Sequence, residues 1–287
     1  VEARLANALV AYVEYLRKLF APYDLAVIYC YVRHTEYWRI AACIALLTLI
    51  SWLALRTRRE SPYLLFGWGW YVVALIPMSG LIQVGSQAMA DRFTYISLIG
   101  IVIALVWGAE GLVRKVELGK GFSKGLFATL AAGCLLATEN YLPCWQDTVR
   151  LFNHALAVTT NNWFASCAVA GELSRIGRYE EAIAHLEQAI QITPRHSDLF
   201  SSLGSVFALS GDHVRAMIAF QRALELKPDD KEAHAQLAAA YATSADSKTR
   251  NGPLALSHAL RACQLVQYRN RNYLDILNLF VWRGEFS

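Results

Sequence analysis

The sequence predicts an all-α protein in which a multi-spanning helical membrane domain is followed by an α-solenoid of helical repeats. The chain is 55% hydrophobic and only 17% charged, whereas a soluble domain carries about 25% charged residues. Residues 1–145 hold nearly all the long apolar runs, and residues further on repeat with a fixed period. The net charge of +4 and the lack of a basic run predict no nucleic-acid partner.

Residues 1–36 are predicted to form an amphipathic segment at the membrane interface. At about 100° per residue, the apolar and polar side chains of 4–20 fall on opposite faces of one helix. The apolar face holds Leu5, Leu9, Tyr12, Leu16, Leu19 and Phe20, and the polar face holds Arg4, Asn7, Glu14 and Lys18. Such a helix lies in the headgroup plane. A helix packed against the rest of the membrane domain fits the pattern equally well.

Residues 37–140 are predicted to form a transmembrane helical domain with about four crossings. The uncharged runs are 40–55, 61–90, 93–109 and 125–138, and a single crossing needs about 20 apolar residues. The second run is longer than that, and Pro77 with Ser79-Gly80 predicts the end of its helix there. The fourth run is the shortest, so a re-entrant segment is its alternative.

Basic loops predict the orientation of these crossings. Arg56, Arg58 and Arg59 lie in one loop, and Arg114, Lys115, Lys120 and Lys124 lie in another. The positive-inside rule places both loops in the cytoplasm. The segment 79–93 is then extracytoplasmic, and the repeats are as well if the fourth run spans. The sequence therefore predicts an integral membrane protein that contacts lipid and carries its repeats outside the cytoplasm.

Residues 145–287 are predicted to form tetratricopeptide repeats. Gly177, Ala182, Ala189 and Pro194 recur 34 residues later as Gly211, Ala216, Ala223 and Pro228, which is the spacing of this repeat. A half repeat at 145–160 precedes them. In the third repeat the second helix is expected five residues late, because of the insertion near 243–253. A fourth repeat is expected to contain its first helix alone.

The first helices of such repeats line a concave groove. In this chain the groove is predicted to be lined by Phe164, Cys167, Ser201, Ser205, Ala235 and Ala239. These residues include no cluster of Lys or Arg, which argues against a clamp for a peptide carboxylate. An extended polypeptide in the groove is the functional interpretation. A spacer solenoid that binds nothing is the alternative.

The other sequence motifs predict no further catalytic or metal-binding site. The six cysteines show no metal-ligand spacing, so we expect no metal site and no disulfide framework. No phosphate-binding loop, dinucleotide fingerprint, nucleophile elbow or zinc-protease motif is present. His34 and Glu36 are close in sequence near a predicted membrane rim, but an isolated His-x-Glu is nonspecific.

The stretches GWGWYVVALIPMSGLIQVGSQAMADRFTYISLIG, WQDTVRLFNHAL and NNWFASCAVAGEL resemble the transmembrane-and-tetratricopeptide-repeat proteins. These are similar to protein O-mannosyltransferases of the GT-C class. The resemblance covers nearly the whole chain and corresponds to the C-terminal portion of the family. It implies a sugar donor on polyprenyl phosphate, used on the extracytoplasmic face. It also implies an acidic catalytic loop that residues 1–36 lack, so this chain alone is expected to be inactive and its catalytic residues are unknown.

Asp91 and Arg92 lie between two apolar runs, at the start of the third crossing. A lipid-linked donor carries phosphate, which favours a cation and helix-end amides at the membrane surface. We therefore expect Arg92 to bind donor phosphate, with Asp91 capping the helix or orienting Arg92. Gln83, Gln87 and Tyr95 are expected on the same rim. An interfacial Asp-Arg pair that only anchors the helix end is the alternative.

Two function classes follow. The first is the C-terminal part of a membrane glycosyltransferase that moves a sugar to protein hydroxyls, with the repeats presenting the acceptor. The second is a membrane-anchored repeat scaffold for protein–protein interaction without catalysis. No cofactor is identified apart from the polyprenyl-phosphate sugar that the resemblance implies.

Overall fold

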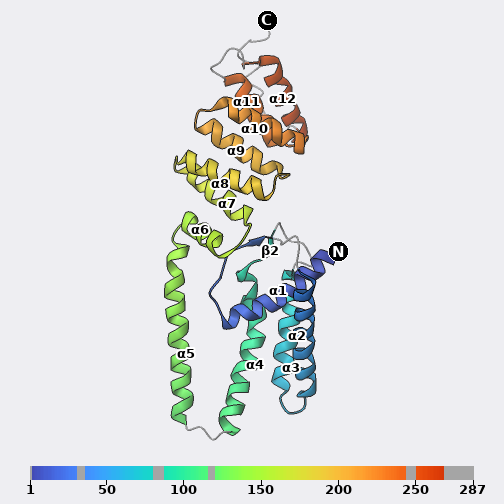
Figure 1. Cartoon of the computed structure of the whole chain (residues 1–287), viewed down its shortest axis with the longest axis vertical. Helices are drawn as coiled ribbons and strands as arrows, with labels where there is room; N and C mark the ends of the chain where they lie inside the picture. The colour runs from blue at the N-terminus through green and yellow to red at the C-terminus, as the bar shows by residue number, and fades with distance from the viewer. Residues whose placement is uncertain (1, 31–35, 80–86, 116–119, 244–249, 268–287) are drawn as a thin grey trace. The chain divides into compact units, whose positions relative to one another are not determined.

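The computed structural model of the chain describes residues 2–30, 36–79, 87–115, 120–243 and 250–267. It divides into two compact units, residues 1–162 and 163–287. Residues 145–162 thus group with the first unit, although the repeat domain is expected to start at 145. The described residues are α-helical apart from short 3-10 turns and one antiparallel pair of strands, β1 (Tyr29–Cys30) and β2 (Gln87–Met89), in the first unit (Figure 1).

The first unit contains six α-helices among its described residues. They are α1 (Glu2–Phe20), α2 (Tyr37–Arg56), α3 (Pro62–Leu75), α4 (Thr94–Lys115), α5 (Lys120–Tyr141) and α6 (Thr148–Val158). Short 3-10 turns are η1 (Ile76–Met78), η2 (Asp91–Phe93) and η3 (Leu142–Trp145). As predicted, the second apolar helix ends near Pro77, since proline lacks the amide proton that would continue it. The following residues, 80–86, lie outside the described part of the chain.

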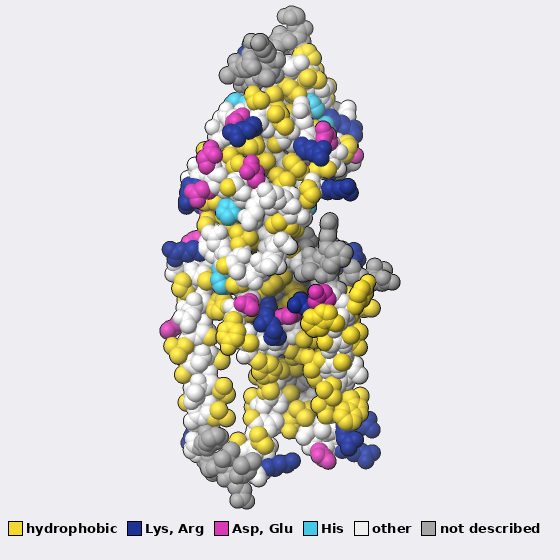
Figure 2. Space-filling model, in the orientation of Figure 1, with side chains coloured by type: hydrophobic (Ala, Val, Ile, Leu, Met, Phe, Trp, Pro, Cys, Tyr) yellow, Lys and Arg dark blue, Asp and Glu magenta, His cyan; other side chains and the backbone are white. Residues whose placement is uncertain are grey.

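Two helices are long and apolar enough to cross a membrane among the described residues: Tyr37–Arg56 and Asp91–Val113. In their most apolar windows, 6% and 11% of the residues are buried in the protein, so most of their apolar surface faces outward. Pro62–Met78 is apolar but shorter. Over α2–α4, Figure 2 shows hydrophobic side chains along the helices and charged side chains at their ends. Four crossings therefore remain a prediction.

Helices α3 and α4 pack against each other through two glycines. A Cβ added to Gly67 would lie 2.3 Å from the carbonyl oxygen of Gly100, and one added to Gly100 would lie 2.5 Å from that of Gly67. Backbones that approach so closely leave no room for a side chain. Small residues at the crossing are how helices associate in lipid, where burial of apolar surface supplies little driving force. This contact sets the close spacing of α3 and α4.

Helix α1 packs against α3 through a face that differs from the predicted apolar face. The residues it buries are Ala8, Ala11, Tyr12, Tyr15 and Lys18. At about 100° per residue, the centre of this face is about 90° from the centre of the leucine face. Tyr12 Oη donates to the carbonyl oxygen of Val72 at 2.7 Å, and Tyr71 Oη donates to that of Tyr12 at 2.6 Å. Leu5 and Phe20 remain exposed, so the helix packs inward and still presents apolar side chains outward.

The second unit is a stack of helical hairpins. Its described helices are α7 (Trp163–Arg175), α8 (Tyr179–Ile192), α9 (Ser197–Leu209), α10 (His213–Leu226), α11 (Lys231–Thr243) and α12 (Gly252–Leu265). The first helices start 34 residues apart, at 163, 197 and 231. Gly177 and Gly211 join the two helices of a hairpin with φ of 82° and 89°, a conformation that favours glycine. The predicted repeat is confirmed.

The alanines of the repeats pack between helices as the sequence predicts. Ala182, Ala189, Ala216 and Ala223 are fully buried. In the third repeat, α12 starts 39 residues after α10, which is one period of 34 plus the expected five. Ala255, Ala259 and Ala262 are buried there in the same way. The predicted fourth repeat, of which only the first helix is expected, falls at 268–287 and lies outside the described residues.

Candidate functional site

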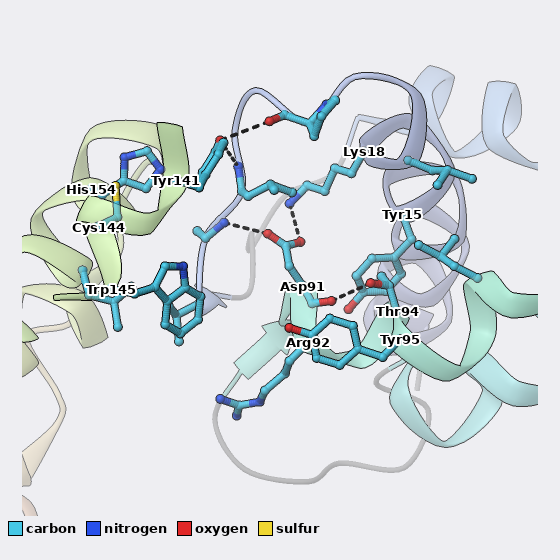
Figure 3. Close-up of a pocket in the computed structure, with 17 residues that line it drawn as sticks. Tyr15, Lys18, Asp91, Arg92, Thr94, Tyr95, Tyr141, Cys144, Trp145 and His154 are labelled. Carbon is cyan, nitrogen blue, oxygen red and sulfur yellow. Dashed lines mark hydrogen bonds and ion pairs between the residues drawn. The ribbon is translucent and has the colours of Figure 1, made fainter. Parts of the chain in front are cut away.

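The carboxylate of Asp91 is the centre of a polar network at the start of α4. Its Oδ1 lies 2.9 Å from Lys18 Nζ, and the Lys18 side chain is only 6% exposed. Its Oδ2 accepts from the backbone amide of Ala26 at 2.7 Å and lies 2.8 Å from Tyr29 Oη. Three chain segments, α1, the loop after it and η2, therefore meet at one carboxylate (Figure 3).

This arrangement corrects the role expected for Asp91. Among the described residues the carboxylate pairs with Lys18 rather than with Arg92, and its oxygens also contact Ala26 and Tyr29, while Ala90 occupies the N-cap position of η2. Lys18 was predicted on the polar face of α1, but it is buried because Asp91 neutralises its charge inside the protein. Burial lowers the pKa of Lys18, and the nearby Asp91 opposes that shift.

The tyrosines around Asp91 are hydrogen-bond partners rather than acids. Burial is the main reason that the pKa of Tyr29 is raised, and the Asp91 charge adds to it. Burial also raises the pKa of Tyr15 to about 12. Tyr15 Oη bridges the amide and carbonyl groups of Ala90 at 3.1 and 3.2 Å. These phenols stay protonated near neutral pH and hold the chain just before Asp91 in place.

A second anchor comes from the end of α5. Tyr141 Oη lies 3.1 Å from the carbonyl oxygen of Pro22 and 2.8 Å from that of Tyr23. The backbone amide of Leu25 approaches the same hydroxyl at 3.4 Å. The loop after α1 is thus held between Asp91 on one side and Tyr141 on the other.

These anchors enclose a cavity of about 560 Å³ in the first unit, which is in the range of small-molecule sites. Most of its wall is apolar and comes from Leu19, Leu25, Val27, Tyr95, Leu98 and Leu151. Lys18, Asp91 and Arg92 contribute charge from one side. Tyr141, Cys144, Trp145 and His154 contribute from the other side, as Figure 3 shows.

Arg92 has a different environment from its neighbour. Its side chain is exposed, and Figure 3 shows it extending away from Asp91. Among the residues that the structure describes it makes no ion pair, and its guanidinium lies 5.5 Å from the ring centre of Phe93. The charges of Lys18 and Asp91 compensate each other. The positive charge of Arg92 on the cavity wall therefore remains uncompensated by this pair.

The other residues predicted for this rim are partly accounted for. Tyr95 lines the cavity and is 74% exposed. Gln87 begins β2, but its side chain lies outside the described part, as do Gln83 and His34. Glu36 accepts from Trp38 Nε1 at 2.6 Å and lies 3.8 Å from Arg39 Nε. Among the described residues, no group of three or more His, Cys, Asp or Glu side chains is arranged to hold a metal ion.

The predicted groove of the repeats is largely made of half-buried side chains. Phe164, Cys167, Ser201, Ser205 and Ala239 are of this kind. Ala235 is an exception, because it is 3% exposed and packs with Ala262 and Cys263 of α12. It therefore belongs to the interior of the third repeat and does not line a groove.

A family model described as tetratricopeptide repeat matches residues 177–240. The chain is 26% identical over 205 residues to protein O-mannosyl-transferase Tmtc3 of Drosophila melanogaster, covering 67% of this chain and 22% of that protein. It is 29% identical over 169 residues to the human protein O-mannosyl-transferase TMTC1, covering 58% and 19%. These similarities confirm the resemblance seen in the sequence. The chain spans about a fifth of the length of these relatives.

Solved structures of repeat proteins are also similar to this chain. MamA matches with a TM-score of 0.39 and 20% identity over 46% of this chain and 75% of its own. The Sgt2 repeat domain of Aspergillus fumigatus matches with a TM-score of 0.40 and 16% identity over 44% and 81%.

Proposed function

We propose that this chain is the part of a membrane glycosyltransferase that holds a polyprenyl-phosphate sugar donor and carries the repeats that present a protein acceptor. The observation that carries the proposal is the exposed guanidinium of Arg92 on the wall of a largely apolar cavity, where it makes no ion pair with any residue that the structure describes. Similarity to proteins named O-mannosyl-transferases supports the reaction class, transfer of a sugar to protein hydroxyls.

The charges of the cavity suit a phosphate attached to an apolar chain. The Lys18–Asp91 pair is neutral as a unit, so the wall repels an anion less than a lone carboxylate would. Arg92 then supplies two parallel N–H donors for phosphate oxygens. Leucine, valine and proline side chains on the same wall suit the first isoprene units of the carrier.

The proposal includes a membrane arrangement. Helices α2 to α5 are proposed as four crossings, with the loops at Arg58 and Lys115 in the cytoplasm. Arg92 and the cavity then lie at the extracytoplasmic surface, and the exposed Leu5 and Phe20 of α1 face the lipid headgroups. The outward-facing apolar surfaces of α2 and α4 support this arrangement.

The repeats are proposed to bind the polypeptide acceptor. The half-buried side chains of Cys167, Ser201 and Ser205 are small and neutral. Such a surface suits an extended backbone with varied side chains better than one charged group. The alternative is a membrane-anchored scaffold without catalysis. It would use the same repeat surface, and it differs from the proposal only in that the cavity holds no sugar donor.

Binding of a short-chain polyprenyl phosphate to the chain in lipid nanodiscs tests the proposal. Arg92→Lys keeps the positive charge but loses the two parallel N–H donors. We expect about 10- to 150-fold weaker binding, because one hydrogen bond to a charged group is lost. Arg92→Gln is expected to weaken it at least as much. Asp91→Asn removes the partner of Lys18 and is expected to have a smaller effect.

The matched control is Arg58→Gln, since Arg58 is also exposed and lies at the other end of the helices. It removes one positive charge without touching the cavity. Affinities that stay near the parental value in Arg92→Lys and Arg92→Gln would leave the helix-anchoring role of Arg92 and the scaffold function standing.

A further inference from the structure

The wall of the cavity opposite Arg92 presents side chains that have no part in the proposed phosphate binding. It is built by the end of α5, by η3 and by α6, and it presents Tyr141, Trp145 and His154. Figure 3 shows Trp145 and His154 facing the cavity from this side, with Arg92 and Tyr95 on the other side.

His154 has unused hydrogen-bonding capacity. Its Nε2 atom is buried and has no hydrogen-bond partner among the described residues. Its ring is held edge-on against Tyr141, with ring centres 5.5 Å apart and an angle of 88°. A buried polar atom without a partner is unfavourable, so a ligand group or water that bonds to Nε2 would be stabilised there.

Trp145 offers a broad apolar surface beside it. The side chain lines the cavity, yet it is 62% exposed. More than half of the Trp145 side chain is therefore left uncovered by the protein, and part of it borders the cavity. A tryptophan at such a site supplies a large contact area with little loss of conformational freedom.

We infer that Trp145 and His154 form a hexose subsite of this cavity, opposite the phosphate-binding Arg92. The inference rests on the proposed function, and what it adds is the position of the sugar. A hexose combines a face of C–H groups with a rim of hydroxyls. The C–H face packs on the indole of Trp145, and one hydroxyl bonds to Nε2 of His154, while Arg92 holds the phosphate.

The test compares two ligands that differ only in the sugar: a short-chain polyprenyl phosphate hexose and the same polyprenyl phosphate without sugar. Dissociation constants are measured for the whole chain in nanodiscs. The parental chain is expected to bind the sugar-bearing ligand more tightly. In His154→Phe, which keeps the ring contact with Tyr141, the sugar-bearing ligand is expected to bind roughly 3- to 10-fold more weakly. The sugarless ligand is expected to bind as before.

Trp145→Ala is expected to cause a similar selective loss, and Trp145→Phe is expected to restore part of it, since a phenyl ring keeps a smaller stacking surface. Trp52→Ala is the matched control, because Trp52 is also exposed but lies on α2. His213→Phe in the repeats is the control for the histidine. Both controls are expected to leave the two affinities unchanged.

The outcomes separate the inference from the proposed function. If Arg92→Gln weakens both ligands but the Trp145 and His154 variants weaken both equally or neither, the sugar subsite is wrong and the phosphate site stands. If the parental chain binds neither ligand, the proposed function is wrong and the subsite is wrong with it.

Discussion

The two units of the chain use glycine for opposite purposes. In the first unit, Gly67 and Gly100 let two backbones touch, since an added Cβ on either would lie within 2.5 Å of the carbonyl oxygen of the other. In the second unit, Gly204 makes room for a ring, since an added Cβ would lie 2.7 Å from Phe220. Phe220 itself is fully buried. The first kind of contact is typical of helices in lipid, and the second is typical of helices in water, where burying apolar surface drives association.

The two units also differ in their ion pairs. The Lys18–Asp91 pair joins residues far apart in the sequence and is mostly buried. In the repeats, Arg175–Glu172, Arg178–Glu181 and Arg215–Asp212 each join residues three positions apart on exposed helix surfaces. Exposed pairs of this kind contribute little to stability. The first unit therefore contains a mostly buried, long-range ion pair, whereas these three pairs of the repeats are local and exposed.

Phe220→Ala is expected to have the largest effect, because it removes the ring that fills the space above Gly204. The expected loss is about 3–5 kcal/mol in the free energy of unfolding of the repeats. Chemical unfolding followed by far-ultraviolet circular dichroism measures it. Ile218→Ala on the same helix is the control, since Ile218 is 60% exposed. Equal losses in the two variants would contradict a packed apolar interior.

Lys18→Met is expected to destabilise the first unit by about 1.5–3 kcal/mol, since it leaves the Asp91 carboxylate without its cation. Combining it with Asp91→Asn is expected to cost less than the sum of the two single changes, because the two residues act as a pair. Thermal unfolding in detergent measures all three. Arg17→Met is the control, because Arg17 is a neighbouring residue whose ion pair with Glu14 is exposed. Additive effects would mean that the pair does not hold the loop.

Gly100→Ala is expected to force α3 and α4 apart, at a cost of about 1–3 kcal/mol. The added methyl group meets backbone and the Cβ of Trp70, neither of which can rotate away. Gly69→Ala is the matched control, because an added Cβ there has no atom within 4 Å. The same detergent unfolding assay applies. A Gly100→Ala chain as stable as Gly69→Ala would show that the two helices do not cross at these glycines.

The smallest effect is expected from His258 in the third repeat. Burial lowers its pKa below the ordinary 6.5, and the neighbouring His234 lowers it further. The unfolded chain then takes up the proton more readily than the native chain. Stability is thus fully present above pH 6.5 and falls as the pH drops from 6.5 through the native pKa.

Unfolding of parental and His258→Gln chains at pH 5 and 7.5 measures this dependence. The Nδ1 atoms of His234 and His258 lie 2.9 Å apart, so one proton between them is accommodated and two are not. His258→Gln is expected to reduce the pH dependence, and His213→Gln is expected to keep it. A steeper pH dependence in His258→Gln would overturn the assignment.

The repeats could be predicted from sequence because each repeat is a local unit. Glycine, alanine and proline at a spacing of 34 specify two helices and their contact without reference to distant residues, and even the five-residue delay of α12 follows from counting. The contacts of the first unit are of another kind. Asp91 meets Lys18 across 73 positions, and Tyr141 meets Tyr23 across 118. No periodicity encodes such pairs.

The candidate site was predictable only at its charged centre. Asp91 and Arg92 are conspicuous because charges between apolar runs are costly. The burial of Lys18 was missed because a helical pattern assigns a lysine to solvent unless its partner is known. The wall of Trp145 and His154 was missed for the same reason, since its position depends on the anchor between Tyr141 and the loop after α1.

That anchor has a consequence for hydrophobic mismatch. A helix turns about 100° and rises about 1.5 Å per residue, so deleting one residue from 125–138 would swing the Tyr141 hydroxyl away from the carbonyl groups of Pro22 and Tyr23. These hydrogen bonds therefore fix the position and the rotation of the end of α5 relative to the loop after α1. In the proposed arrangement, in which α5 crosses the membrane, a thicker bilayer would have to thin around the 14-residue uncharged stretch of this helix.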